Sequence, residues 1–279
     1  MKIGAHVSIA KGLPAALTKI QTMGANCLQI FSSSPRSFGT PKATSDDRKK
    51  FKTEAIKLGI GPNFIHANYL VNLGTDKQRL LELSTQSLIT DLNFADQIGV
   101  SGVVVHTGSH GGRGFETVVR PVAQVITQIL KKADGQAKLC LEITAGGMGR
   151  IGANFEELQQ LLQLVNNSRL GVCLDTCHLF AAGYKFDSHE TVDKLKTKIT
   201  KTVGWSPVYC MHTNDSKGDF DSHIDRHENI GAGKIGKAPF KLLLQDEKFK
   251  KLPFILETPG FDGKGPDQKN IEILKKLAG

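Results

Sequence analysis

Three consecutive stretches decide the fold: KLCLEIT at residues 138–144, NFEELQQLLQLVNNS at 154–168 and LGVCLDT at 170–176. The first and third are short runs of apolar residues, which is typical of strands buried in a parallel sheet. The middle stretch repeats apolar residues every three or four positions, as one face of a helix does. A strand, a helix and a second strand in this order form a βαβ unit.

The same alternation continues through the whole chain. Helix-like segments such as residues 76–99 separate the strand-like runs, and no linker rich in Pro, Gly or Ser divides them. The eight runs are KIGAHVS (2–8), CLQIFSS (27–33), NFIHANY (63–69), GVVVHTG (102–108), KLCLEIT (138–144), LGVCLDT (170–176), VYCMHTN (208–214) and PFILETP (253–259). Eight alternations predict an α/β protein with a closed (β/α)₈ TIM barrel, in which residues 1–279 form a single catalytic domain.

The composition fits a soluble globular protein. Hydrophobic residues make up 39% of the chain and charged residues 23%. The first residues lack the apolar run of a signal peptide, and no stretch is long and apolar enough to span a membrane. We therefore expect a cytoplasmic monomer with no membrane contact and no obligate protein partner. The five cysteines are an odd set that lies mostly in strand-like runs, so we expect buried thiols and no structural disulfide.

The formal net charge of +9 favours a polyanionic partner. Clustered Lys and Arg gain affinity for nucleic acids by releasing counterions from phosphates. The Lys-rich stretches lie on amphipathic segments, where solvated helix faces are the more common explanation. Charge alone therefore supports a nucleic acid partner only weakly.

The ends of the predicted strands carry the chemistry. Active sites of TIM barrels lie where the strands end, and from the third strand onward each end has an imidazole or a carboxylate. A loop after the seventh strand adds a carboxylate and an imidazole two residues apart, on one side of an extended chain. The complete set is His66, His106, Glu142, Asp175, His178, His212, Asp225, His227 and Glu257. So many carboxylates at one rim repel one another unless bound cations offset the repulsion, so we expect a metal site.

Five imidazoles and four carboxylates suit Zn²⁺ best, with Mn²⁺ or Fe²⁺ as alternatives at individual positions. Nine ligands are enough for three open sites. Paired metals assist in-line attack on phosphorus and stabilise the leaving oxygen, which favours phosphodiester hydrolysis. Of the other histidines, we expect His6 in the core or behind the ligands, and His110, His189 and His223 in loops.

Several segments resemble the endonuclease IV family of apurinic/apyrimidinic endonucleases. They are KIGAHVS (2–8), HANYLVNLG (66–74), GVCLDTCHLFAAGY (171–184), HTNDSKGDFDSHIDRH (212–227) and LET (256–258). The resemblance spans nearly the whole chain and implies three zinc ions. It implies that His66, His106 and a bridging Glu142 bind the first zinc. It assigns the second to Glu142, Asp175, His212 and Glu257, and the third to His178, Asp225 and His227.

The resemblance also implies the reaction. In the family, a hydroxide held by the first two metals, beside Glu142 and Glu257, attacks the phosphate 5′ to an abasic site. The products are a 3′-hydroxyl and a 5′-deoxyribose phosphate. The implied partner is double-stranded DNA that contains abasic sites or blocked 3′ ends, the latter cleaned by a 3′-phosphodiesterase activity in base excision repair.

Arg36, Tyr69 and Leu70 match the positions at which the family fills the space left by a flipped-out sugar, a strategy consistent with base flipping. Three departures concern the loops. Asn68 and Val71 stand where smaller or hydroxyl-bearing residues are expected, and Asp221 stands where a glycine is expected. We expect these changes to affect loop conformation and DNA contacts rather than metal binding.

Two alternatives stay open at this stage. A sugar isomerase or epimerase on the same barrel would need Glu142, Asp175, His212 and Glu257 around one or two metals, but not the five further ligands. A DNA-binding protein with purely structural metals is disfavoured, since structural zinc sites are usually closed and rich in sulfur.

Overall fold

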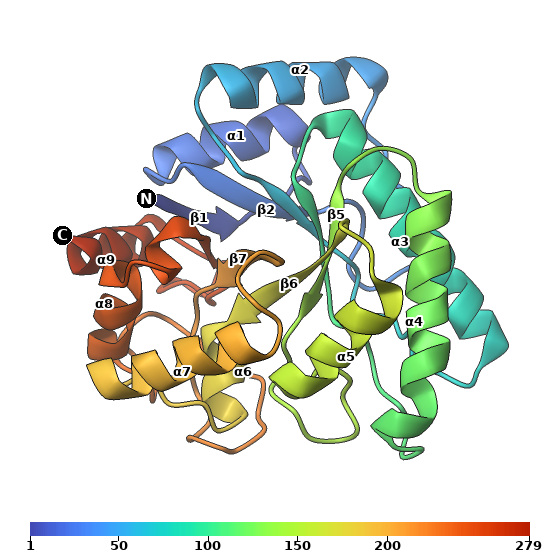
Figure 1. The fold of residues 1–279 in the computed structure, drawn as a ribbon. Helices are drawn as coiled ribbons and strands as arrows, with labels where there is room; N and C mark the ends of the chain where they lie inside the picture. Colours follow the sequence, from blue (N-terminus) through green and yellow to red (C-terminus); the bar gives the residue numbers. More distant parts are fainter.

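Eight parallel strands close into a barrel in the computed structural model, which describes residues 1–279 (Figure 1). The order around the barrel is β1-β10-β7-β6-β5-β4-β3-β2. The strands are β1 (Lys2–His6), β2 (Cys27–Phe31), β3 (Phe64–His66), β4 (Gly102–Val105), β5 (Lys138–Glu142), β6 (Leu170–Asp175), β7 (Val208–His212) and β10 (Pro253–Leu256). The prediction of a (β/α)₈ TIM barrel is confirmed.

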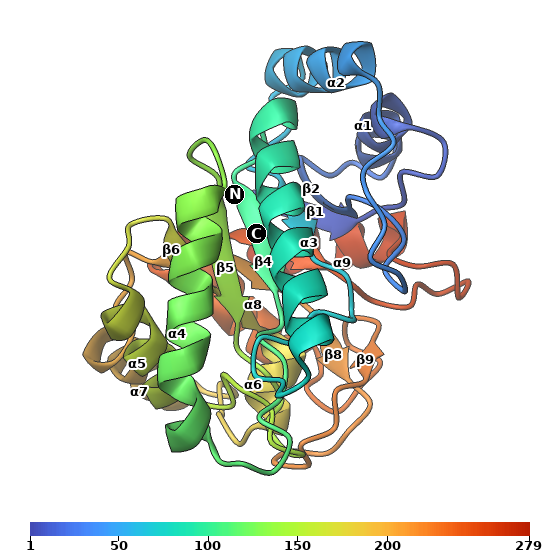
Figure 2. The ribbon, with the colours of Figure 1, turned by 90° about the vertical axis from the view of Figure 1, so that its right-hand side faces the viewer.

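Helices surround the barrel, and Figure 2 shows α3 and α4 side by side on its outside. They are α1 (Leu13–Thr22), α2 (Ser45–Lys57), α3 (Gln78–Ile98), α4 (Phe115–Lys132), α5 (Phe155–Val165), α6 (Thr176–Ala181), α7 (His189–Lys201), α8 (Lys237–Gln245), the 3₁₀ turn η1 (Phe249–Lys251) and α9 (Gln268–Ala278). No helix is both long enough and apolar enough to cross a membrane.

The helix ends follow from local chemistry. The side chain of Asn154 accepts a hydrogen bond from the backbone N–H of Glu157 and so begins α5. Gly99 ends α3 in a left-handed conformation with φ of 70°, which costs glycine little. Both positions agree with the helices predicted from the sequence.

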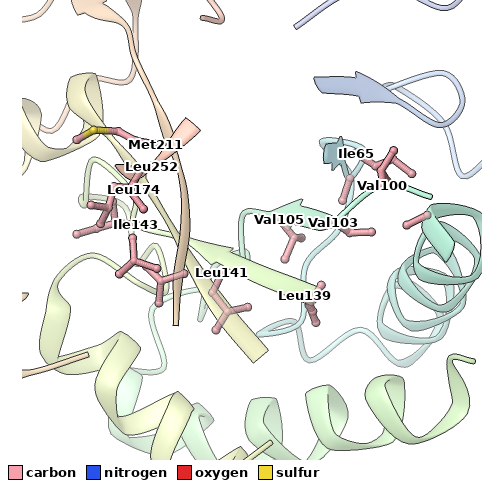
Figure 3. Close-up of a cluster of buried hydrophobic side chains, with 14 of the residues drawn as sticks. Ile65, Val100, Val103, Val105, Leu139, Leu141, Ile143, Leu174, Met211 and Leu252 are labelled. Carbon is pink, nitrogen blue, oxygen red and sulfur yellow. The ribbon is translucent and has the colours of Figure 1, made fainter. Parts of the chain in front are cut away.

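Successive side chains of each strand point alternately to the barrel interior and to the surrounding helices, and both layers are apolar. Figure 3 shows Leu139 and Leu141 of β5 among the buried side chains between strands and helices. The residues between them face the barrel interior, because successive strand residues point to opposite sides. The interior holds a compact cluster: Cys27, Phe64, Val104, Cys140, Cys173, Cys210 and Ile255. All five cysteines of the chain are buried and unpaired.

This interior cluster places the functional side chains. Two residues after each of its members, the chain presents another side chain on the same inner side, at or just beyond the strand end. Those side chains are Gln29, His66, His106, Glu142, Asp175, His212 and Glu257. The two-residue period of the strands therefore places seven polar side chains directly above the apolar interior cluster.

Two features were not predicted. The antiparallel strands β8 (Asp215–Ser216) and β9 (His227–Glu228) pair within the loop region that follows β7. His189 was expected in a loop, but it is the first residue of α7, because Ser188 accepts from the backbone N–H of Thr191 and starts the helix there.

Candidate metal centre

The nine strand-end and loop residues meet at one place. Six of them line a pocket of about 390 Å³ above the barrel, together with Phe31 and Tyr69. The pocket-lining ligands are His66, His106, His178, Asp225, His227 and Glu257. Another hollow of about 570 Å³, between the loops after β1 and β2, contains one carboxylate, Asp47, and no histidine. The pocket above the barrel is therefore the candidate metal centre.

Glu142 lies in the middle of the cluster and is fully buried. Its Oε2 is 3.3 Å from Nε2 of His66 and 3.2 Å from Nε2 of His106. Its other oxygen, Oε1, is 3.0 Å from Nδ1 of His212. The two oxygens of one carboxylate thus face two different groups of ligands, which is the geometry of a bridging ligand.

The donor atoms form three compact groups that match the predicted sets. In each group the potential ligand atoms lie within 4.8 Å of one another. The groups are His66, His106 and Glu142; Glu142, Asp175, His212 and Glu257; and His178, Asp225 and His227. All nine predicted ligands are brought together.

A fourth grouping joins Cys177 to Asp175 and His227. Burial raises the pKa of the Cys177 thiol to about 12, so this side chain stays protonated. A thiol binds zinc as the thiolate, and Cys177 is therefore a poorer ligand than the carboxylates beside it.

Backbone carbonyls orient two of the imidazoles. Nδ1 of His66 lies 2.7 Å from the carbonyl oxygen of Ala67, and Nδ1 of His178 lies 2.9 Å from that of Ile143. A carbonyl only accepts, so each Nδ1 carries a proton, and in the neutral ring that binds a metal each Nε2 presents a lone pair to the centre. This arrangement is typical of histidines that bind metals.

Asp175 ends β6 and begins α6. Its Oδ1 accepts from the backbone N–H of His178 at 2.9 Å, and its Oδ2 accepts from the side-chain amide of Asn214 at 2.7 Å. Asn214 in turn accepts from the backbone N–H of Glu257 at 2.7 Å. Asn214 therefore ties the ends of β6, β7 and β10 together below the ligands.

The third group depends on the loop between β8 and β9. Nε2 of His178 is 3.0 Å from Oδ1 of Asp225, and Nε2 of His227 is 3.4 Å from the same oxygen. His178 is supplied by α6 and His227 by β9. The pairing of β8 with β9 holds the third group beside the other two.

The electrostatics of the cluster fit bound cations. Burial would lower the pKa of both His178 and His227. Asp175 and Asp225 nevertheless raise the pKa of His178 well above its usual range. Asp225 raises the pKa of His227 to about 9. Burial would raise the pKa of Glu142, but His106 and His212 hold it well below its usual range. The buried carboxylates thus stabilise positive charge strongly.

Three buried atoms in the cluster also lack a hydrogen-bond partner: Oε2 of Glu142, Nε2 of His178 and Nε2 of His227. Each of these atoms lies within 3.4 Å of an oppositely charged or polar side chain but makes no hydrogen bond to it. Such an arrangement leaves room for a cation between them. Unpaired buried polar atoms are costly. Nitrogen and oxygen donors arranged in this way fit zinc.

Comparisons with known proteins agree with this geometry. The model of the xylose isomerase-like TIM barrel family matches residues 17–277. A Chloroflexus aggregans protein named probable endonuclease 4 is 35% identical, and the match covers 99% of this chain and 97% of that protein. The crystal structure of endonuclease IV from Thermus thermophilus superposes with a TM-score of 0.87 at 35% identity, covering 99% of this chain and 98% of that one. The chain belongs to the endonuclease IV family.

Membership of the endonuclease IV family places the chain among the hydrolases that cut nucleic acids. A D-tagatose 3-epimerase-like protein also superposes, with a TM-score of 0.71 at 21% identity over 99% of this chain and 97% of that one. That likeness is one of fold alone.

Of the three residues expected from the sequence to contact DNA, Tyr69 lines the pocket, and Arg36 and Leu70 lie in the loops beside it. Arg36 is exposed in the loop after β2, and Tyr69 and Leu70 are exposed in the loop after β3. The backbone N–H of Tyr69 donates to the carbonyl of Pro35 at 3.0 Å and so joins the two loops. The Tyr69 ring lies 5.3 Å from Phe31, edge to face.

The three departures from the endonuclease IV pattern are accommodated. Asn68 accepts from the backbone N–H of Leu70 at 3.0 Å and donates to Ser87 at 2.9 Å, while Val71 is buried. Asp221 has a φ of 58°, a conformation that explains why glycine is expected there and that Asp tolerates better than most residues. These changes leave the nine ligands together.

The sequence interpretation missed Gln29. It lies fully buried on β2 and contacts both His212 and Glu257. The signal was present, because Gln29 occupies on the second strand the place that the ligands occupy on later strands. His6 occupies that place on β1 and contacts Glu257, as expected of a residue that supports a ligand, and its ring also lines the pocket.

Proposed function

We propose that the chain is a DNA-repair endonuclease that hydrolyses the phosphodiester bond 5′ to an abasic site with the aid of three zinc ions. The observation that carries the proposal is the convergence of three ligand groups around Glu142. Two of those groups share this carboxylate, and the third adjoins them through His178, whose Nδ1 is 3.2 Å from Oε1 of Glu142. A barrel that binds one or two metals needs no third group.

The proposed first zinc site consists of His66, His106 and Glu142, and the second of Glu142, Asp175, His212 and Glu257. The third consists of His178, Asp225 and His227. Zinc at such positions polarises phosphate oxygens and lowers the pKa of water. The protein's own contribution is to fix the donor atoms, to bury Glu142 and to bring Glu257 beside the reacting phosphate.

The rim supports a DNA substrate. Tyr69 offers an aromatic ring in the wall of the pocket, and Arg36 and Leu70 offer a cation and an aliphatic side chain in the exposed loops that Tyr69 joins. Side chains of these kinds stack on bases or fill the space left by a flipped nucleotide. The net charge of +9 favours the approach of a phosphate backbone. Double-stranded DNA that contains an abasic site is therefore the proposed substrate.

The proposed products are a 3′-hydroxyl and a 5′-deoxyribose phosphate. The same centre would act on blocked 3′ ends, because both reactions break the bond between a 3′ oxygen and a phosphorus atom and leave a 3′-hydroxyl. We therefore propose a 3′-phosphodiesterase activity of the same ligands.

The direct test is to incubate the zinc-loaded protein with a 5′-labelled duplex that carries one abasic site and, separately, with common ketoses. The wild-type protein should cut on the 5′ side of the lesion and leave a 3′-hydroxyl that a polymerase extends. Glu257→Gln should reduce the rate by at least about 100-fold, because it removes a charge next to the reacting phosphate. Glu272→Gln, on the outer helix α9, is the matched control and should keep the wild-type rate.

Turnover of a ketose without incision would refute the nuclease assignment and favour a sugar isomerase or epimerase. Near-normal incision by Glu257→Gln would refute the role of Glu257.

A further inference from the structure

Gln29 is the one amide among the side chains that cap the barrel interior. It is fully buried at the end of β2, between ligands that come from β7 and β10. A buried amide has two donors and one acceptor oxygen, and each is costly to leave unpaired. The partners of Gln29 therefore constrain how the neighbouring ligands are protonated.

The orientation of the amide follows from Glu257. Oε1 of Glu257 lies 2.6 Å from the amide nitrogen of Gln29. A carboxylate only accepts, so the nitrogen must face Glu257 and the amide oxygen must face the opposite way. There it lies 2.8 Å from Nε2 of His212.

The amide oxygen in turn fixes His212. Because that oxygen only accepts, Nε2 of His212 must donate, so in the neutral ring that binds a metal the lone pair lies on Nδ1. Nδ1 lies 3.0 Å from Oε1 of Glu142 and 3.2 Å from Oε2 of Glu257. A lone pair that faces two carboxylates marks the position of a cation, so the amide of Gln29 selects the nitrogen that binds it.

The second N–H of the amide reaches His6. Nδ1 of His6 is 3.1 Å from the amide nitrogen, so it accepts and the ring carries its proton on Nε2. Nε2 of His6 is buried without a hydrogen-bond partner, and the ring lines the pocket. Phe31 packs against this ring at 4.4 Å and limits its rotation. The wall of the pocket therefore contains an unused N–H donor, on a ring whose other nitrogen lies 3.4 Å from Oε1 of Glu257.

We propose that Gln29 is a positioning residue that selects Nδ1 of His212 as the coordinating atom and, through its second N–H, makes His6 a donor to a phosphate oxygen of the substrate. The proposal rests on the zinc and DNA assignments made above. One amide thus couples a metal ligand, a carboxylate and a substrate contact. Its two halves have separate experiments.

The first experiment compares zinc retention in the wild type, in Gln29→Met and in Cys27→Ala. Met keeps the volume and removes the hydrogen bonds, whereas Cys27 lies two residues earlier on the same inner face of β2, in the interior apolar cluster and outside the ligand groups. A colorimetric chelator should strip zinc from Gln29→Met at about 10- to 100-fold lower concentration than from the wild type, because partners that orient ligands have effects of this size. Cys27→Ala should behave as the wild type.

Nitrogen-15 NMR of histidine-labelled protein adds a readout that a loss of packing would not produce. His212 should hold its proton on Nε2 in the wild type and in Cys27→Ala, and should exchange between both nitrogens in metal-free Gln29→Met. Equal zinc retention and an unchanged His212 tautomer in Gln29→Met would overturn the proposal. A wild-type protein that binds no zinc would instead refute the metal centre itself.

The second experiment measures steady-state incision by His6→Leu and His6→Gln. The amide of Gln places an N–H near the position of Nε2, and Leu has none. His6→Leu should raise KM for the abasic duplex at least about tenfold, as the loss of a hydrogen bond to a charged group does, with unchanged zinc content. His6→Gln should restore most of the loss. Wild-type KM in His6→Leu, or equal impairment in both variants, would overturn the role of His6.

Discussion

Single residues in this site divide into a buried set and an exposed set. Glu142 is wholly buried among imidazoles, whereas Tyr69 is 65% exposed and Leu70 41% exposed at the rim. Large apolar side chains rarely stay exposed in this way without a partner. In the proposed function the buried set holds the metals and the exposed set contacts DNA. The two roles should therefore be separable by mutation.

Arg36→Ala tests this separation. Removal of the guanidinium should weaken binding to the abasic duplex about tenfold, a typical effect of truncating one important interface side chain. Zinc content should not change, because Arg36 lies outside the ligand groups. Arg79→Ala, an exposed arginine on α3, is the control for the loss of one positive charge. Loss of zinc in Arg36→Ala would show that the residue supports the metal centre instead.

Asp91 gives the protein a pH-dependent stability. It is buried on α3 and accepts from the hydroxyl of Ser32 at 2.5 Å. Burial raises its pKa from 3.8 to about 6, so the folded state keeps the proton at a pH where the unfolded state has lost it. The stability contributed by the protonated acid is therefore fully present below about pH 4 and is lost as pH rises from there through about 6, with a total loss of about 3 kcal/mol by pH 8, roughly half of it already below pH 5.

Asp91→Asn should remove this dependence, because Asn cannot ionise and still accepts from Ser32. Relative to the wild type, the free energy of unfolding of the variant should improve by roughly 1 kcal/mol between pH 5 and pH 8. Urea unfolding at the two pH values measures the change, and Asp46→Asn on the surface of α2 is the control. A difference between variant and wild type that does not vary with pH would contradict the account of Asp91.

The strands carry the site because they alternate strictly. Each ligand at the end of a barrel strand, which means β3, β4, β5, β6, β7 and β10, follows an apolar residue of the interior cluster by two positions. On β1 the equivalent of that apolar residue is Gly4, two positions before His6. A Cβ on Gly4 would lie 2.0 Å from the carbonyl oxygen of Cys27, so β1 and β2 approach too closely for any side chain.

Gly4→Ala should therefore destabilise the barrel. The contact is with backbone that cannot move aside, so the free energy of unfolding should fall by more than about 2 kcal/mol. Gly39→Ala is the control, since the atom nearest to its added Cβ would be the hydroxyl oxygen of Ser37, 3.5 Å away. Urea unfolding checks both variants. An unchanged midpoint in Gly4→Ala would show that β1 and β2 are less tightly joined than the structure describes.

Strands and helices could be predicted from the sequence because their periods are local properties. The apolar run and terminal Glu142 of β5 sufficed to locate that strand and its ligand. The pairing of β8 with β9 could not be predicted, since two-residue strands have no period. The tautomers of His66 and His212 could not be predicted either, because they depend on which acceptors the fold brings to each ring, such as Gln29 in the case of His212.

The whole molecule combines an apolar barrel interior with a cluster of imidazoles and carboxylates at the strand ends. The closed order of the strands brings the ends of β3, β4, β5, β6, β7 and β10 to one side, so ligands spread over most of the chain meet within a few ångströms. The sequence predicted this convergence, because six consecutive predicted strands end in an imidazole or a carboxylate. The third ligand group is the feature on which the proposed DNA-cutting centre differs from a sugar-converting site with one or two metals.

The zinc content of the purified protein tests the central claim most directly. Elemental analysis and native mass spectrometry should give three zinc ions per chain, one for each ligand group. His227→Ala should lower the count toward two, because it removes a ligand of the third group, whereas Asp219→Asn in the same loop should leave it at three. A wild-type protein that binds only one or two zinc ions after full loading would contradict the trinuclear centre.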